Sequence, residues 1–447
     1  MRAFRLLVLC ALVAAALHCH RCAAQGTYPA ETYSPEALRA DIDHLQRLLL
    51  RKHPAPFAYA TRDRLEDVLD SLRATVIGPM PELRFLSHIA ALYPLLGDGH
   101  TMFLPSPFTA SRGMFARSLP LLTYWTDGHL FVRSNGSPDP RVRPGMEILA
   151  INGVPAAAIM DTLLRRQVRD GVNTTYPHWI LNTYFRAFYR FSFGEPDTFA
   201  VDLREGDARS QVRIAALPTD SIAANRMRWE PMRIIAQEQE HYTFETDLDT
   251  VRSIALLRIP GFDDLGIPGA SPRQCKQHLR RVFAMLERHG IRKLILDLRN
   301  NQGGDPALAK ELLAHLLKEP FHLVLDGPAA GRCRPVKRPF TGKLVVLMNG
   351  GSFSVTGMVL SCLERHQRAT FIGEEAGGNR TVLSGSPQHF VLPNTHIACH
   401  ISTRTWQLAD RPDDGHGVMP TIRVVPTVQA IVNGTDPVLE AAYKALD

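Results

Sequence analysis

The chain has 447 residues, of which 45% are apolar and 21% are charged. These values are ordinary for soluble globular proteins, so the composition excludes a disordered chain, a collagen-like repeat and a multi-span membrane protein. The net charge of +7 comes from 51 basic and 44 acidic residues without a long run of one sign, which does not indicate a nucleic-acid-binding surface. The length predicts about three domains.

Residues 1–24 have the layout of a secretory signal peptide. A basic start is followed by an apolar run from Leu6 to Leu17, and small residues precede Gln25. The apolar run is shorter than the roughly 20 residues of a membrane-spanning helix, although an uncleaved anchor is the alternative. We therefore expect export to the periplasm or the extracellular space, with no stable membrane span after cleavage.

Four cysteines would remain after cleavage, an even number in an oxidising compartment: Cys275, Cys333, Cys362 and Cys399. One or two disulfides are therefore an alternative to free thiols, and the sequence does not choose among the pairings. Cys362 lies on the apolar face of a predicted helix, which favours a buried thiol there.

Residues 31–110 repeat apolar residues at helical spacing and predict a small helical bundle. Ser34 is placed to cap the first helix, because Pro35 follows it. The next two predicted helices cover residues 65–72 and 81–96, the second with a kink at its internal proline.

Residues 115–215, the middle block, show the short alternating runs of strands. The predicted strands are 119–124, 130–133 and 147–151. Residues 142–153 resemble the segment that precedes the helix of PDZ-like domains, in which an exposed sheet edge captures a peptide as an added strand. A plain β-rich spacer is the alternative.

Residues 225–447, the C-terminal block, alternate strands and helices and predict βαβ units around a mostly parallel sheet. The predicted strands are 254–259, 293–298 and 344–348, and the predicted helices include 278–287 and 306–317. Chemistry in such sheets gathers at the carboxyl ends of the strands.

Ser354 is the candidate nucleophile, because it lies after a buried strand and a Gly-Gly turn, at the start of a predicted helix. Free N–H groups at a helix start can stabilise an oxyanion. The alternative is that Ser352 or Ser354 only caps the helix. No lysine occurs between Lys343 and Lys444, so a histidine is the natural base for a serine.

His100 is the candidate base, since the turn Gly97–Thr101 presents it just past a helix end. His416 is the alternative base. A third signal is the glycine-rich turn that ends the strand over Asp297–Gly304. Such a turn can present a backbone N–H toward a reacting carbonyl, and the alternatives are a phosphate-binding turn or a simple tight turn.

These motifs together resemble the tail-specific, or C-terminal-processing, serine peptidases of family S41, and among them the branch similar to the tricorn protease core. The motifs stand in order at 97–101, 144–153, 256–262, 297–304 and 349–354. The resemblance implies a multidomain α/β protein with a helical N-terminal bundle, a PDZ-like β-rich module and a catalytic domain similar to the ClpP/crotonase fold.

The resemblance also implies roles for individual residues. Ser354 would be the nucleophile and His100 the base, with the N–H of Val355 and of Gly303 or Gly304 in the oxyanion hole. Asn379 stands where Ser/Lys members have the catalytic lysine, so that dyad is absent. Asp414 would be the acidic helper, and Asp413, Glu374 and Glu375 are its alternatives. Gly99 also departs from the branch, which has serine there.

The sequence therefore predicts a secreted serine peptidase that acts on peptides or unfolded proteins, without a cofactor and without a metal. One alternative is a non-catalytic peptide- or ligand-binding protein on the same fold, because Thr356-Gly357 replaces the Ser-Glu of many processing peptidases. An esterase that uses Ser354 and His100 is the other.

Overall fold

The computed structural model describes residues 32–113, 116–230, 243–327 and 330–447. The predicted signal peptide, residues 1–24, lies outside this part of the chain. Within it, no helix combines the length and the apolar character needed to cross a membrane.

The N-terminal helices occupy the predicted region, but the second is longer than the predicted 65–72, and a 3-10 turn divides the helix predicted over 81–96. They are α2 (Pro35–Lys52), α3 (Arg62–Thr75), α4 (Glu82–Ile89), the 3-10 turn η2 (Ala90–Leu92) and α5 (Tyr93–Leu96). The Ser34 side chain accepts a hydrogen bond from the N–H of Ala37, which confirms the predicted cap. Gly97 ends α5 in the left-handed conformation, with φ of 56°, and so releases the chain into the turn that carries His100.

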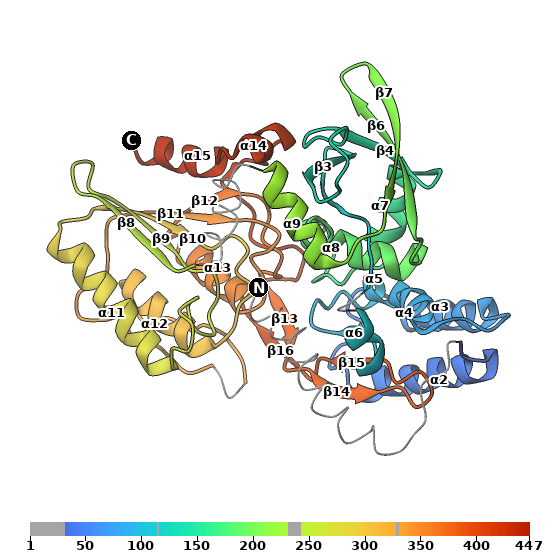
Figure 1. Cartoon of the computed structure of the whole chain (residues 1–447). Helices are drawn as coiled ribbons and strands as arrows, with labels where there is room; N and C mark the ends of the chain where they lie inside the picture. Colours follow the sequence, from blue (N-terminus) through green and yellow to red (C-terminus); the bar gives the residue numbers. More distant parts are fainter. Residues whose placement is uncertain (1–31, 114–115, 231–242, 328–329) are drawn as a thin grey trace.

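The N-terminal block does not close its core alone. Strand β1 (Met102–Leu104) pairs antiparallel with β15 (Ala398–Ile401), which in turn pairs with β14 (Gln388–Val391). Leu392, Ile397 and Cys399 are buried in the same apolar cluster as the N-terminal helices. Figure 1 shows β14 and β15 beside α2.

The middle block is built around a sheet in the order β2-β3-β4-β6-β7. Its strands are β2 (Leu121–Thr126), β3 (His129–Asn135), β4 (Glu147–Ile151), β5 (Val154–Pro155), β6 (Thr198–Glu205) and β7 (Ala208–Ala215). Its helices are α7 (Ala156–Leu164) and α8 (Thr175–Phe193), with α6 (Pro107–Gly113) before and α9 (Thr219–Trp229) after the sheet. Its buried apolar side chains form one cluster within residues 119–216.

The C-terminal block contains a second sheet, in the order β17-β12-β11-β10-β9-β8, in which only β8 runs antiparallel to its neighbour. Its strands are β8 (Glu245–Asp249), β9 (Ile254–Arg258), β10 (Lys293–Asp297), β11 (Lys343–Met348), β12 (Thr370–Gly373) and β17 (Ile422–Arg423). A separate pair is β13 (Val382–Gly385) with β16 (Arg404–Gln407). The predicted parallel sheet is thus confirmed.

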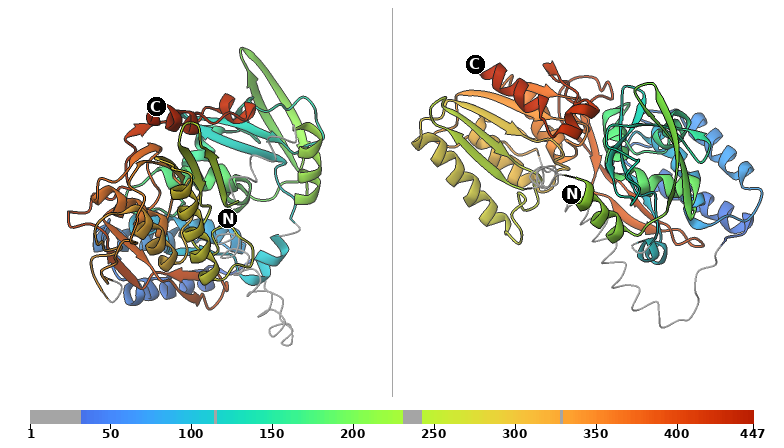
Figure 2. Two further views of the ribbon diagram at one scale, coloured as in Figure 1. Left: turned by 90° about the vertical axis from the view of Figure 1, so that its left-hand side faces the viewer. Right: turned by 45° about the horizontal axis from the view of Figure 1, so that its top comes forward.

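Helices cover both faces of this sheet, as its continuous apolar strands require. Leu294 and Leu296 of β10 point to α11 (Pro272–Arg288), α12 (Pro306–Leu316) and α13 (Val355–Arg365), whereas Ile295 points to α15 (Pro437–Leu446). The short α14 (Val428–Asn433) precedes α15. Figures 1 and 2 show α11 and α12 on one side of the sheet and α15 on the other.

The four described cysteines are free thiols. Cys275 and Cys362 are buried in the core of the C-terminal block, whereas Cys399 is buried in the N-terminal cluster. No disulfide forms among these four cysteines, and the buried free thiol predicted for Cys362 is confirmed.

Candidate active site

Ser354 lies between β11 and α13, at the carboxyl edge of the parallel sheet. Its backbone has φ of 58° and ψ of −125°, a strained conformation for a residue with a side chain. The turn before it permits only glycine: a Cβ on Gly350 would lie 2.2 Å from the carbonyl oxygen of Thr175, and one on Gly351 would lie 2.4 Å from Trp179 Nε1. The tight packing around this turn fixes the strained conformation of Ser354.

The alternative that Ser354 merely caps α13 is wrong, since its side chain makes no capping hydrogen bond. Its Oγ instead lies 2.9 Å from His100 Nε2, although the two residues are 254 positions apart. Ser352 is buried and donates its hydroxyl to the carbonyl of Leu298 at 2.9 Å, so it stabilises the turn that precedes Ser354.

The His100 ring stacks on Phe353, with ring centroids 4.7 Å apart. This contact explains the glycine at position 99, because a Cβ there would lie 2.6 Å from the Phe353 ring. Burial lowers the pKa of His100 below its ordinary value of 6.5, against the opposing charge of Asp98. The imidazole is therefore neutral at pH 7, as a general base must be.

Asp98 is the carboxylate next to the other ring nitrogen, with Oδ1 3.9 Å from His100 Nδ1. His100 Nδ1 is buried and has no hydrogen-bond partner among the described residues. Asp98 Oδ1 accepts the backbone N–H of His100 at 2.8 Å, and Oδ2 accepts the hydroxyl of Thr101 at 2.6 Å. The carboxylate is thereby held against the turn that carries the base.

His53 keeps Asp98 ionised. The N–H of Ala55 donates to His53 Nδ1 at 3.2 Å, so Nε2 carries the ring proton and donates it to Asp98 Oδ2 at 3.0 Å. Burial alone would raise the pKa of Asp98, but the hydrogen bond from His53 holds it well below its ordinary value of 3.8.

Asp170 is a second buried carboxyl group at the site, and it comes from the segment between α7 and α8. Its Oδ1 accepts the N–H of Gly99 at 2.8 Å, and its Oδ2 accepts the N–H of Asn379 at 3.1 Å. Burial, and next the charge of Asp98, raise the pKa of Asp170 to about 8. The two N–H donors oppose this rise, because they favour the ionised carboxylate.

The predicted oxyanion donors are unequal in position. Val355 opens α13, so its N–H has no acceptor within the helix. Gly303, with φ of 90°, lies against the nucleophile: a Cβ on it would be 2.8 Å from Ser354 Cβ. Its own N–H already donates to Asn301 Oδ1 at 2.9 Å. Gly304 faces Phe262, whose carbonyl carbon a Cβ would approach to 2.5 Å.

Asp414 does not meet His100. Its side chain is half exposed, forms an ion pair with Arg380 and accepts the backbone N–H of His416 at 3.2 Å. The alternative base His416 is also elsewhere, with Nδ1 3.1 Å from Glu375 Oε1. Both lie on the loop before β17, whose path past Arg380 carries these side chains away from the serine.

Asn379, at the place of the lysine in Ser/Lys members, is buried and fully hydrogen-bonded. Its Nδ2 donates to Asp413 Oδ1 at 2.8 Å, and its Oδ1 accepts the N–H of Thr381 at 2.6 Å. Tyr59 donates its hydroxyl to the same Asp413. The alternative helper Asp413 is thus occupied with Asn379 and Tyr59.

Asp98, His100 and Asp170 each offer a ligand atom, and these atoms lie within 4.8 Å of one another. The three residues are the described group that could hold a metal ion. However, the carboxylate oxygens of Asp98 and Asp170 already accept hydrogen bonds from the protein. The arrangement therefore suits proton transfer better than metal binding.

Sequence reasoning missed Asp98, His53 and Asp170. Asp98 stands two residues before His100 in the turn Gly97–Thr101, but the resemblance implied a helper carboxylate near the C-terminus. His53 and Asp170 carry no motif of their own, because only the tertiary packing brings them to this turn.

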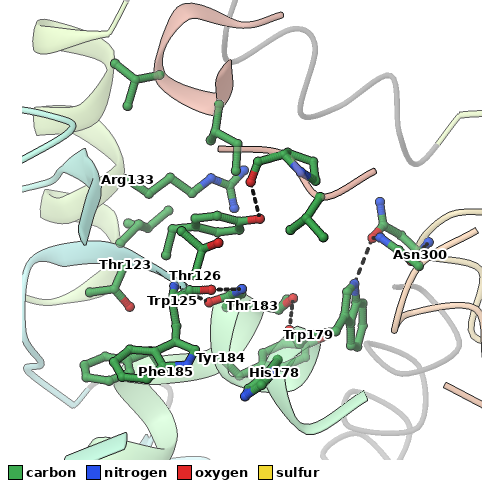
Figure 3. A pocket seen from close by; sticks show the side chains of 18 of the residues that line it. Thr123, Trp125, Thr126, Arg133, His178, Trp179, Thr183, Tyr184, Phe185 and Asn300 are labelled. Atoms are coloured by element: carbon green, nitrogen blue, oxygen red, sulfur yellow. Dashed lines mark hydrogen bonds between the residues drawn. The ribbon is translucent and has the colours of Figure 1, made fainter. Parts of the chain in front are cut away.

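A cavity of about 1340 Å³ lies behind the nucleophile turn, between the middle block and the parallel sheet of the C-terminal block. Figure 3 shows Trp179 joined to Asn300 on its wall, a hydrogen bond of 2.8 Å. The edge strand β2 also lines it, but Asn182 donates to the carbonyl of Trp125 and accepts its N–H, at 3.2 and 2.7 Å. A side chain thus occupies the place of an added strand at Trp125.

Residues 253–424 match the model of Peptidase family S41. This match confirms the predicted resemblance to that family over this part of the C-terminal block. No curated protein sequence matches the chain.

The fold is similar to that of mature CPAF, with a TM-score of 0.66 at 14% identity, over 92% of this chain and 96% of that one. A structure of mature CPAF complexed with lactacystin gives a TM-score of 0.65 at 14% identity, over 92% and 98%. The photosystem II D1 C-terminal processing protease matches with a TM-score of 0.42 at 16% identity, over 89% and 96%. The likeness to CPAF confirms the predicted multidomain α/β fold over nearly the whole chain.

Proposed function

We propose that the protein is a serine peptidase in which Ser354 attacks the scissile carbonyl and His100 is the general base. The observation that carries this proposal is the hydrogen bond of 2.9 Å between Ser354 Oγ and His100 Nε2. The strained backbone of Ser354 and the lowered pKa of His100 both support it, because each favours a reactive serine next to a neutral base. The match of residues 253–424 to Peptidase family S41 supports peptide bonds as the substrate.

The reaction follows from this geometry. His100 Nε2 takes the hydroxyl proton as Ser354 Oγ bonds to the carbonyl carbon, and the carbonyl oxygen becomes an oxyanion. The N–H of Val355, at the positive end of α13, stabilises this charge together with the glycine turn at 303–304. The imidazolium then gives its proton to the departing amine, and water releases the acyl group by the same steps.

We assign the acidic helper to Asp98 rather than to Asp414. When Nε2 accepts the serine proton, Nδ1 must carry the ring proton, and Asp98 Oδ1 is 3.9 Å from it. A small closure of the site would bring these two atoms to hydrogen-bond distance. The ionised Asp98 stabilises the imidazolium that forms, as the carboxylate of a serine-protease triad does.

Export and peptide binding belong to the same proposal. The layout of residues 1–24 supports secretion to the periplasm or the extracellular space. The middle block would act as a PDZ-like module that presents peptides or unfolded proteins to Ser354. Peptide capture along β2 would have to displace Asn182 from Trp125.

The test is degradation of a mixed peptide library by the mature chain, read by mass spectrometry, beside Ser354→Ala and His100→Ala. We expect the wild type to cut and both variants to lose cutting. Cleavage of esters alone would favour the esterase. If peptides and esters both stay intact and Ser354 is not labelled by a fluorophosphonate, the binding-protein alternative replaces this proposal.

A further inference from the structure

Asp170 lies outside both catalytic turns and contacts each of them. It belongs to the segment that joins α7 to α8, and its side chain is buried, with 3% of the residue exposed. Helix α7 is anchored in the core of the middle block by Ile159, Met160 and Leu163. One carboxyl group therefore extends from the middle block into the site.

On the base side, Asp170 Oδ1 accepts the N–H of Gly99, the residue directly before His100. The neighbouring backbone strengthens this contact, because the N–H of Gly171 donates to the carbonyl of Gly97 at 2.8 Å. Two consecutive residues thus hold the turn that carries the base.

On the nucleophile side, Asp170 Oδ2 accepts the N–H of Asn379. The preceding residue, Gly378, donates its N–H to the carbonyl of Ser352 at 3.2 Å, two residues before the nucleophile. The two oxygens of Asp170 therefore connect the turn of His100 to the loop that supports Ser354.

The segment has no freedom to shift without disturbing these bonds. The N–H of Val172 donates to the carbonyl of Gly415 at 2.9 Å, and a Cβ on Gly171 would lie 2.3 Å from the same oxygen. A cavity of about 270 Å³ adjoins Asp170 and His53.

We propose that Asp170 is a positioning residue that sets the alignment of His100 with Ser354 and couples it to the middle block. The proposal rests on the function proposed above. Asp170 acts through the backbone of Gly99 and Asn379, so its loss should slow the chemical step and leave substrate binding unchanged. A misplacement of about 1 Å in a catalytic pair lowers the rate about a hundredfold.

The experiment compares the full chain with Asp170→Asn, which keeps the shape but leaves one of the two N–H groups without an acceptor. Asp161→Asn is the matched control, because Asp161 lies on exposed α7 surface and pairs with Arg165. A fluorophosphonate first counts the competent serines in each preparation. We expect kcat per titrated site to fall 10- to 100-fold in Asp170→Asn, with KM within about twofold, and to be unchanged in the control.

A purely structural role would lower the titrated fraction and the melting temperature but leave kcat per titrated site unchanged, which would overturn the proposal. An equal loss in Asp161→Asn would also overturn it. If Asp170→Asn does not fold, Asp170→Glu decides in the same assay, since it keeps the carboxyl group but moves it by one methylene. A wild type that is neither labelled nor active would instead refute the proposed function.

Discussion

The two turns that form the site are built in different ways. The nucleophile turn, residues 349–355, is one strand, two glycines and one helix, and its shape is forced by close backbone contacts. The histidine turn, residues 97–101, is held by carboxyl groups of Asp98 and Asp170. Local sequence therefore determines where the serine lies, whereas buried charge and long-range packing determine where its base lies.

Breaking the nucleophile turn at its reactive atom has the largest expected effect. Ser354→Ala should lower kcat by about a millionfold, as removal of a catalytic serine does, while the fold persists because the hydroxyl makes no capping bond. Peptide cleavage and circular dichroism measure the two parts. Residual cleavage within tenfold of the wild type would show that another residue is the nucleophile.

Removing the negative charge of Asp98 at the histidine turn should have the second-largest effect on kcat. Asp98→Asn keeps a side-chain oxygen near the backbone of His100 but removes the carboxylate, so we expect kcat to fall by about 10² to 10⁴. Asp414→Asn is the matched comparison and should retain nearly full activity. The reverse order of the two losses would return the helper role to Asp414.

A smaller effect should follow from crowding the nucleophile turn. Gly303→Ala adds a Cβ 2.7 Å from the Val355 nitrogen, at a φ of 90° that alanine rarely adopts. We expect kcat/KM to fall about a hundredfold through displacement of the oxyanion site. Steady-state kinetics measure it, and wild-type rates would mean that this glycine does not border the reacting carbonyl.

The pH profile sharpens the comparison by isolating the base. Protonated His100 cannot accept the serine proton, so kcat/KM should fall as the pH falls through its pKa, which lies below 6.5. The negative charge of Asp98 opposes the lowering, so Asp98→Asn should move this acid limb to still lower pH. A shift to higher pH would contradict the contact assigned between Asp98 and His100. The pH profiles of His53 and Asp170 variants are the controls for these two neighbouring titratable groups.

The smallest effect is expected at the surface. Asp414→Ala removes a half-exposed ion pair with Arg380, which should lower the free energy of unfolding by about 1 kcal/mol or less. Chemical denaturation measures this change. A loss of several kcal/mol would show that the loop before β17 contributes more to the fold than its exposure indicates.

The sequence predicted what local pattern controls. Strands β10 and β11, the helix after Ser354 and the histidine turn all follow from apolar spacing and glycine placement. The pairing of β1 with β15 did not follow, because a three-residue strand carries no signal for a partner almost 300 residues away. The positions of the carboxyl groups did not follow for the same reason: whether Asp98, Asp170 or Asp414 is buried depends on segments that meet only in the folded chain.

The pairing of β1 with β15 also bears on the biogenesis of the protein. His100 is two residues before β1, and β1 is completed only by residues 398–400. A chain emerging from the ribosome has made the base and the nucleophile long before it has made the strand that fixes the base. On the function proposed above, cleavage would begin only once synthesis has passed β15, when the histidine turn is held in place.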